Sequence, residues 1–196
     1  MHWTSYSKME YFKENYLNPE KDLRILDIGS FDKNGDYNYG LILNEENWTY
    51  DGLDLKEGNN VDIVVEDPYD WKEIKNKTYD VIVSGQSLEH NEFFWITLKE
   101  IDRVLKPGGM ICLIAPSSGP VHRNPYDCWR FTDKGMESMA KYIDFKVLES
   151  GTNAGNENPW HDSYVIAIKK ENGNTDKLSD KMDEMESTLD KILELL

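Results

Sequence analysis

The histidines of this chain, with the acids near them, are the side chains best suited to chemistry. His90, His122 and His161 can act as general bases because imidazole titrates near neutral pH. Together with Asp127 and Asp162 they would also suffice as the ligands of a metal site. These five residues are dispersed, however, and no pair has the i, i+4 spacing of two ligands on one helix. We therefore expect proton transfer here and no bound metal.

The segment 116–131, PSSGPVHRNPYDCWRF, concentrates reactive side chains. It is too long and too rich in proline, histidine, arginine and aromatic residues to be a simple connector. Arg123 and Arg130 can each offer a planar, two-point donor to a phosphate or carboxylate of a ligand. Tyr126 is the aromatic residue best placed to stack on a ligand ring. The segment is therefore a candidate substrate-binding loop.

Structural alternatives remain open for the same residues. His122 could simply fix its turn through Asp127. Arg130 could pair with Glu89 and hold two loops together, which is as good an explanation as anion binding. His161 is a further substrate-binding candidate, although its Gly/Asn-rich loop carries little other information.

A polar loop with two glycines ends the apolar run in residues 24–39, RILDIGSFDKNGDYNY. The run contains Asp27 and breaks at Gly29, and Gly35 follows in the loop. A buried strand often ends in this way at a nucleotide-like ligand, because glycine lets the backbone approach the ligand closely. Asn34-Gly35 is also a favoured hairpin turn, so this pattern alone is weak evidence.

The rest of the chain alternates between strand-like and helix-like segments. The expected strands are 23–28, 48–55, 61–65, 79–84, 110–115, 145–150 and 163–169, and the expected helices are 3–17, 41–43, 69–76, 91–105 and 132–142. Buried strands separated by helices favour a parallel sheet covered on both faces, with the last two strands forming an antiparallel pair.

The polar segments that follow the first four strands would then meet at one edge of the sheet. They are residues 29–39, Asp54, Asp67 and residues 85–90. Ligands bind at the carboxyl ends of the strands in such sheets. This convergence favours a ligand loop over a hairpin turn at residues 24–39.

The composition restricts the partners and the location of the protein. At 196 residues the chain can form one main domain with a proper core. Its formal net charge of -15 opposes binding to nucleic acid or to an anionic membrane. It lacks the run of about 20 apolar residues that spans a bilayer and the residue order of a signal peptide. We therefore expect a cytoplasmic protein in which Cys112 and Cys128 are free thiols.

The C-terminal part of the chain has a different pattern. We expect a domain over residues 1–170, including an N-terminal helix within 1–18 that packs on it, and then a linker over 171–177. Within residues 178–196, apolar side chains recur at spacings of four, three, four, three and four, which is a heptad pattern. A helix this short is marginal alone, so it should pair with a copy of itself or fold back on the domain. We favour a homo-oligomer.

The sequence resembles the class I S-adenosylmethionine-dependent methyltransferases over about residues 23–170. The segments that carry the resemblance are LDIGSFDKNGDYN, YDGLDLKEGNNVD, VSGQSLEHN, RVLKPGG and HRNPYDCWRF, and they look like a subgroup of bacterial and phage methyltransferases linked with sugar or polysaccharide modification. The resemblance implies a Rossmann-like α/β fold. Its mostly parallel seven-stranded sheet would have the order 3-2-1-4-5-7-6, with strand 7 antiparallel and helices on both faces, followed by the C-terminal heptad helix.

The resemblance also implies which residues bind the cofactor, S-adenosylmethionine. Asp27 would order the first loop and the methionine amino group, Asp54 would accept the ribose hydroxyls, and Asp67 would lie near the adenine amino group. The full expected set is Asp27, Gly29, Ser30, Phe31, Asp54, Leu55, Asp67, Ser84, Gly85 and Gln86. Phe31 stands where a second glycine is common in the superfamily, so the loop geometry here differs from the usual one.

A methyltransferase acting on a hydroxyl needs a group that takes the hydroxyl proton, and histidine is the best candidate. We expect His122, His90 and Asp127 to be catalytic and the acceptor to be small, most plausibly a sugar hydroxyl. One alternative is a non-catalytic scaffold that keeps the cofactor pocket and recruits a partner through its C-terminal helix. A nicotinamide-dependent oxidoreductase is less consistent with the first loop, which lacks GxGxxG.

Overall fold

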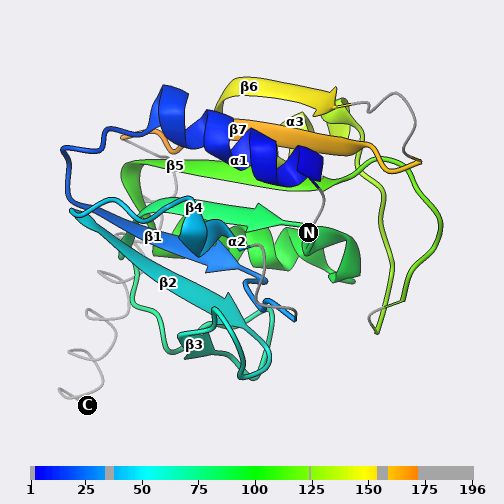
Figure 1. The fold of residues 1–196 in the computed structure, drawn as a ribbon, viewed down its shortest axis with the longest axis horizontal. Coiled ribbons are helices and arrows are strands. Elements are labelled where there is room, and N and C mark those ends of the chain that lie inside the picture. Colours follow the sequence, from blue (N-terminus) through cyan, green and yellow to red (C-terminus); the bar gives the residue numbers. More distant parts are fainter. Residues whose placement is uncertain (1–2, 34–37, 124, 154–158, 172–196) are drawn as a thin grey trace, which may run out of the picture.

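A seven-stranded sheet with the order β3-β2-β1-β4-β5-β7-β6 forms the centre of the protein (Figure 1). The computed structural model describes residues 3–33, 38–123, 125–153 and 159–171. The strands are β1 (Leu23–Ile28), β2 (Trp48–Asp54), β3 (Ile63–Val64), β4 (Tyr79–Gly85), β5 (Leu105–Pro116), β6 (Lys146–Asn153) and β7 (Asp162–Ile168). β7 runs antiparallel to both its neighbours, β5 and β6, while the other pairs are parallel. The expected strand order is therefore confirmed.

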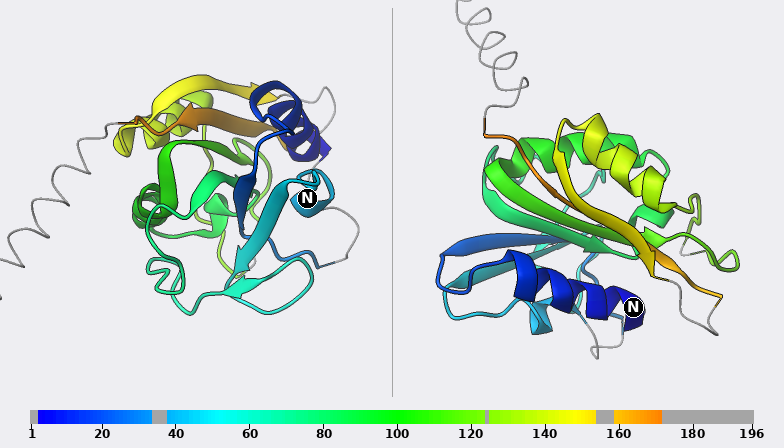
Figure 2. Two further views of the ribbon diagram at one scale, coloured as in Figure 1. Left: turned by 90° about the vertical axis from the view of Figure 1, so that its left-hand side faces the viewer. Right: turned by 90° about the horizontal axis from the view of Figure 1, so that it is seen from above.

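Helices cover both faces of this sheet, as Figure 2 shows. The helices are α1 (Trp3–Tyr16), α2 (Phe94–Val104) and α3 (Asp133–Tyr142), with short 3-10 turns η1 (Tyr39–Leu41) and η2 (Leu88–His90). Successive residues of a strand point to opposite faces, so Leu26 packs in the core beneath α2 and α3 while Ile25 packs in the core beneath α1. The alternation divides the interior into two apolar layers.

The first helix is fixed to the sheet by polar contacts as well as by its buried side chains Met9 and Phe12. Glu149 of β6 accepts hydrogen bonds from Tyr16 and Tyr11 at 2.7 and 3.0 Å, and Lys8 lies 3.4 Å from the same carboxylate. This cluster joins the start of the chain to the far edge of the sheet.

Residues 69–76 form turns, and the prediction of a helix there is wrong. Several of their backbone groups bond to side chains of α2, although the amide of Ile74 also donates to the Trp71 carbonyl at 3.0 Å. The amide of Trp71 donates to Glu100 at 2.9 Å, and Arg103 donates to the carbonyls of Trp71 and Ile74 at 2.9 and 2.8 Å. The third strand is also shorter than expected, at Ile63–Val64.

The expected heptad segment 178–196 lies outside the described residues, as do Asn34 and Gly35. No helix within the described part of the chain is long and apolar enough to cross a lipid bilayer.

Candidate functional site

The loop after β1 turns sharply against the ends of β2 and β4. Gly29 has a φ of +76°, and a side chain there would come within 2.3 Å of the Ser87 hydroxyl. The amides of Gly29 and Ser30 donate to the Leu53 carbonyl at 2.9 and 3.1 Å. The hydroxyl of Ser30 is buried without a hydrogen-bond partner among the described residues. The loop is thus a tight cradle, and the Ser30 hydroxyl in it is available to bond a ligand.

Asp54 closes the end of β2 beside this cradle. Its two carboxylate oxygens accept hydrogen bonds from the amides of Leu55 at 2.7 Å and Phe31 at 3.2 Å. A carboxylate has about four acceptor positions, so Asp54 can still accept from a ligand diol. Phe31 itself is 42% exposed, and its ring packs against Gly58.

Asp27 is buried behind the cradle rather than open to it. Its carboxylate accepts a 2.5 Å hydrogen bond from Tyr50, whose hydroxyl in turn accepts one from Asn60. Burial raises the pKa of Asp27 to about 7, although the Tyr50 bond opposes this shift. The predicted contact with a cofactor amino group stays a prediction.

The end of β4 supplies three of the predicted residues. The Ser84 hydroxyl is fully buried and donates to the Ile28 carbonyl at 2.9 Å. Gly85 lies against the Tyr39 ring, and the Gln86 amide group donates to Asp162 at 3.0 Å. The Ser84 hydroxyl and the Gln86 amide nitrogen therefore both donate to groups of the protein itself.

The remaining predicted cofactor residue, Asp67, lies exposed after β3, where it accepts a hydrogen bond from the Tyr69 amide at 2.8 Å. Among the predicted substrate residues, Arg123 and Tyr126 are exposed. The backbone of His161 is tied to Ser117 and Ser118.

Arg130 forms a two-point ion pair with Asp127. The nitrogen–oxygen distances are 2.6 and 2.9 Å, so the alternative pairing of Arg130 with Glu89 is not what the structure shows. The hydrogen bonds from Arg130 lower the pKa of Asp127 far below its usual range, although burial opposes them. Asp127 also accepts the His122 amide at 2.7 Å. The charged pair thus braces the loop that carries His122.

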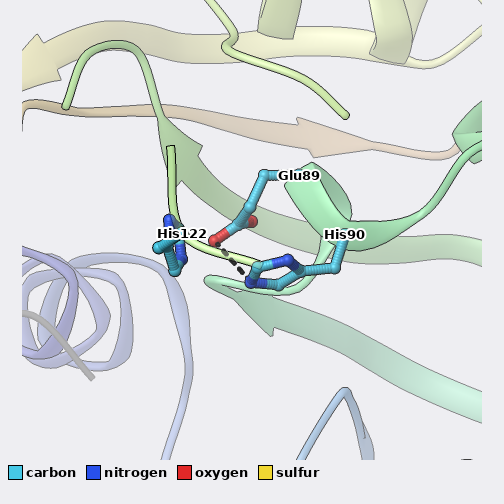
Figure 3. Close-up of side chains that lie close together, drawn as sticks. All are labelled: Glu89, His90 and His122. Atoms are coloured by element: carbon cyan, nitrogen blue, oxygen red, sulfur yellow. Dashed lines mark ion pairs between the residues drawn. The ribbon is translucent and has the colours of Figure 1, made fainter. Parts of the chain in front are cut away.

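Glu89, His90 and His122 lie close together, as Figure 3 shows. Glu89 and His90 belong to η2, which follows β4, and His122 comes from the loop after β5. One ligand atom of each residue lies within 4.8 Å of the others. The imidazoles of His90 and His122 stack edge to face, with ring centres 4.9 Å apart. The fold therefore brings together two residues that the sequence analysis treated separately.

The electrostatics of this cluster are unusual. Glu89 is 0% exposed, both of its carboxylate oxygens lack hydrogen-bond partners among the described residues, and burial raises its pKa to about 8. Its Oε1 lies 3.7 Å from Nε2 of His90. The His122 side chain is 40% exposed, and partial burial lowers the pKa of its imidazole. The carboxyl group that lies beside the two imidazoles therefore has no hydrogen-bond partner among the described residues.

Comparison with known protein families finds a match to this chain. The sequence matches the family described as a methyltransferase domain over residues 30–113, which is less than half of the chain. The matched part runs from the first cofactor loop into β5. The chain contains a methyltransferase domain.

Solved structures share the fold of this methyltransferase domain at low sequence identity. The 1,6-didemethyltoxoflavin-N1-methyltransferase of Burkholderia thailandensis, with S-adenosylhomocysteine bound, is 15% identical with a TM-score of 0.66, over 86% of this chain and 80% of that one. An S-adenosylmethionine-dependent methyltransferase of Methanosarcina mazei is 18% identical with a TM-score of 0.62, over 80% and 96% of the two chains. No curated protein sequence matched.

The same fold also occurs in the cyclase SpnF, which is 13% identical with a TM-score of 0.66, over 84% of this chain and 80% of that one. The fold alone therefore does not fix the reaction, whose details must be argued from the site.

The match to a methyltransferase domain and the S-adenosylhomocysteine bound in the Burkholderia structure together indicate S-adenosylmethionine as the cofactor. The residues present fit such a ligand. Gly29 forms a cradle that any side chain would fill, Ser30 offers a buried hydroxyl without a partner, and Asp54 keeps free acceptor positions. Together these would hold a nucleoside with a charged tail.

Glu89 is the residue of this site that sequence reasoning missed as a functional group. The LEH segment was recognised, but Glu89 was considered only as a partner of Arg130. The alternation of apolar and polar residues there says nothing of burial, because η2 is a single short turn. Only the packing of the loop after β5 shows that Glu89 is enclosed.

Proposed function

We propose that this domain transfers the methyl group of S-adenosylmethionine to a hydroxyl of a small, sugar-like acceptor. The observation that carries the proposal is the Glu89, His90 and His122 cluster beside the cofactor loops. When bound, S-adenosylmethionine supplies a methyl group on a positively charged sulfur. The remaining task of the protein is to position the acceptor oxygen and to let its proton leave.

The cluster is the site at which the acceptor hydroxyl would lose its proton. His122 meets the acceptor, because its side chain is 40% exposed whereas Glu89 is enclosed. Asp127 and His90 are positioning residues. Asp127 holds the backbone of His122, and His90 is fixed by a 2.5 Å hydrogen bond between its Nδ1 and the Tyr126 carbonyl.

The loop after β5 offers the surface for the acceptor. Tyr126 is 55% exposed and Arg123 is exposed, so an aromatic face and a cationic group stand near the imidazoles. A polar ring with an anionic substituent, such as a sugar phosphate, fits this combination. Arg130 is already paired with Asp127, so Arg123 is the better candidate for the anion.

A methylation screen tests the proposal. The protein is incubated with S-adenosylmethionine and panels of sugars, sugar phosphates and amines, and products are identified by mass spectrometry. We expect O-methylated sugars, and we expect His122→Asn to lower kcat by about 10²- to 10⁴-fold with unchanged affinity for S-adenosylhomocysteine. Methylation of amines alone would contradict the hydroxyl assignment.

We further propose that residues 1–170 form the methyltransferase domain of a cytoplasmic protein and that residues 178–196 drive homo-oligomerisation. The support is the heptad spacing in the sequence. Deletion of residues 171–196 should lower the mass measured by light scattering and leave cofactor affinity unchanged. An unchanged mass would contradict self-association through this segment.

A further inference from the structure

We propose that Glu89, His90 and His122 bind one divalent transition-metal ion, with Zn²⁺ as the best-suited ion. The inference deepens the proposed function and rests on it only for the role of the ion, not for its binding. No metal site was expected from the sequence, because the candidate ligands are dispersed along the chain. The fold removes that objection, since it brings ligand atoms of these three residues within 4.8 Å of one another.

The carboxylate of Glu89 is the first reason to place a cation here. It is fully enclosed, it points between the two imidazoles in Figure 3, and neither oxygen has a hydrogen-bond partner among the described residues. A buried carboxylate without a partner is costly, and proteins compensate such groups by pairing them or by binding a metal. The charge of Arg130 favours ionised Glu89, but no hydrogen bond joins the two among the described residues, and two guanidinium nitrogens of Arg130 bond to both oxygens of Asp127.

The hydrogen bonding of His90 is the second reason. A carbonyl oxygen can only accept, so the contact of Nδ1 with the Tyr126 carbonyl at 2.5 Å fixes the ring proton on Nδ1. In the neutral ring the lone pair is then on Nε2, which lies 3.7 Å from Oε1 of Glu89. Metal-binding histidines usually donate their second ring nitrogen to a carbonyl or carboxylate in this way.

The surroundings of His122 complete the arrangement. Its Nδ1 is buried without a hydrogen-bond partner among the described residues and lies 3.5 Å from Asp127, an acid that can orient a ligating imidazole. Ligands about 2.1 Å from a tetrahedral ion lie about 3.4 Å apart. The Glu89–His90 separation is already close to this value, and the partly exposed His122 can close the rest by side-chain rotation.

Two imidazoles and one carboxylate leave a fourth position open, as in catalytic rather than structural zinc sites. The open position would face the side from which His122 is exposed. An ion there would lower the pKa of a hydroxyl that it binds, which is how the cluster would assist loss of the acceptor proton to solvent.

Calorimetric titration of Zn²⁺ into the full chain, stripped of metal with a chelator and free of cofactor and acceptor, tests the site. We expect saturation at one ion per chain. Co²⁺ in place of Zn²⁺ should give a visible absorption spectrum that Zn²⁺ removes. Glu89→Gln and His122→Ala should each weaken Zn²⁺ binding by more than about tenfold, the lower end of the cost of losing an outer partner of a metal site.

Matched variants control the titration. Glu92→Gln makes the same change at an exposed acid in the same loop, and His161→Ala removes a histidine outside the cluster, so both should bind Zn²⁺ as the unmodified protein does. If Glu89→Gln fails to fold, His122→Ala still tests the metal site, because the His122 side chain is partly exposed and its removal should leave the fold intact. Absence of saturable binding, or equal binding by His122→Ala and the unmodified protein, would overturn the inference.

Binding of S-adenosylhomocysteine, measured on the same samples, separates the two proposals. If the protein binds S-adenosylhomocysteine but shows no saturable binding of Zn²⁺, the metal site is rejected and the methyltransferase proposal stands. Binding of Zn²⁺ with methylation of amines alone would keep the metal site and reject the hydroxyl acceptor.

Discussion

Two glutamates of this protein have opposite surroundings. Glu149, at the edge of the sheet, accepts hydrogen bonds from Tyr164, Tyr16 and Tyr11 and pairs with Lys8, although its side chain is still 26% exposed. Burial opposes ionisation of Glu149, but these bonds outweigh it and lower its pKa to about 2. Glu89 is fully enclosed and has no hydrogen-bond partner for its carboxylate among the described residues.

The difference separates a structural acid from a functional one. A charge that is fully bonded stabilises the fold, whereas an enclosed acid without partners costs stability and persists where chemistry or a ligand needs it. Asp27 lies between the two extremes, since it is buried and its carboxylate accepts a hydrogen bond from Tyr50. Four substitutions that remove charge or a hydroxyl test this order.

The same substitution at both glutamates should give the largest contrast. Glu149→Gln replaces three hydrogen bonds to a charged acceptor by weaker neutral ones and removes the pairing with Lys8. It should lower the free energy of unfolding by about 3 kcal/mol, because bonds to charged groups are worth roughly twice neutral ones. Glu89→Gln in metal-free protein should change it by less than about 1 kcal/mol. Urea denaturation measures both.

S-adenosylhomocysteine affinity provides the control for this pair, because Glu149 is far along the sheet from the cofactor loops and its variant should bind normally. Equal destabilisation by the two substitutions would remove the distinction between the two acids.

Asp27 should make the stability depend on pH in a defined direction. Its pKa of about 7 in the folded protein exceeds the ordinary value of 3.8, so the folded state holds a proton that the unfolded state has lost. The unfolding free energy therefore falls as pH rises from about 4 to about 7. Relative to Asp27→Asn, the unmodified protein should lose about 2 kcal/mol between pH 5 and pH 7.

Chemical denaturation at several pH values measures this difference. Asp67→Asn is the matched control, since Asp67 is exposed. Stability curves for Asp27→Asn and the unmodified protein that run parallel over this range would contradict the assignment.

Ser84→Ala should have a smaller effect than Glu149→Gln or than the titration of Asp27. Its hydroxyl bonds to the Ile28 carbonyl, so the loss should be about 1 kcal/mol of stability with little change in affinity for S-adenosylhomocysteine. If calorimetry shows a large loss of affinity for S-adenosylhomocysteine and stability is unchanged, the Ser84 hydroxyl contacts the cofactor instead.

Local patterns predicted the sheet well. The run Leu23–Ile28 was found at its expected bounds because a continuous apolar stretch before a glycine permits few other structures. The order of the strands followed from the resemblance to methyltransferases. Residues 69–76 were wrongly predicted because their backbone partners are Glu100 and Arg103, which no local pattern reveals.

The site was predictable in parts. The glycine loop, Asp54 and His90 were singled out from their positions after strands, and His122 from the composition of the loop that carries it. The proximity of His90 to His122 and the enclosure of Glu89 depend on how two loops pack, and that is a non-local property. For Arg130, anion binding and pairing with Glu89 were left as equal alternatives, whereas the acid that it binds is Asp127, three residues away.

A crystal structure with S-adenosylhomocysteine bound tests the central claim most directly, because it locates the sulfur relative to the cluster. We expect the ribose at Asp54, the chain of the ligand against Gly29, and the sulfur on the side that faces His90 and His122. A sulfur that points away from both imidazoles would contradict the assignment of the Glu89, His90 and His122 cluster as the reaction site.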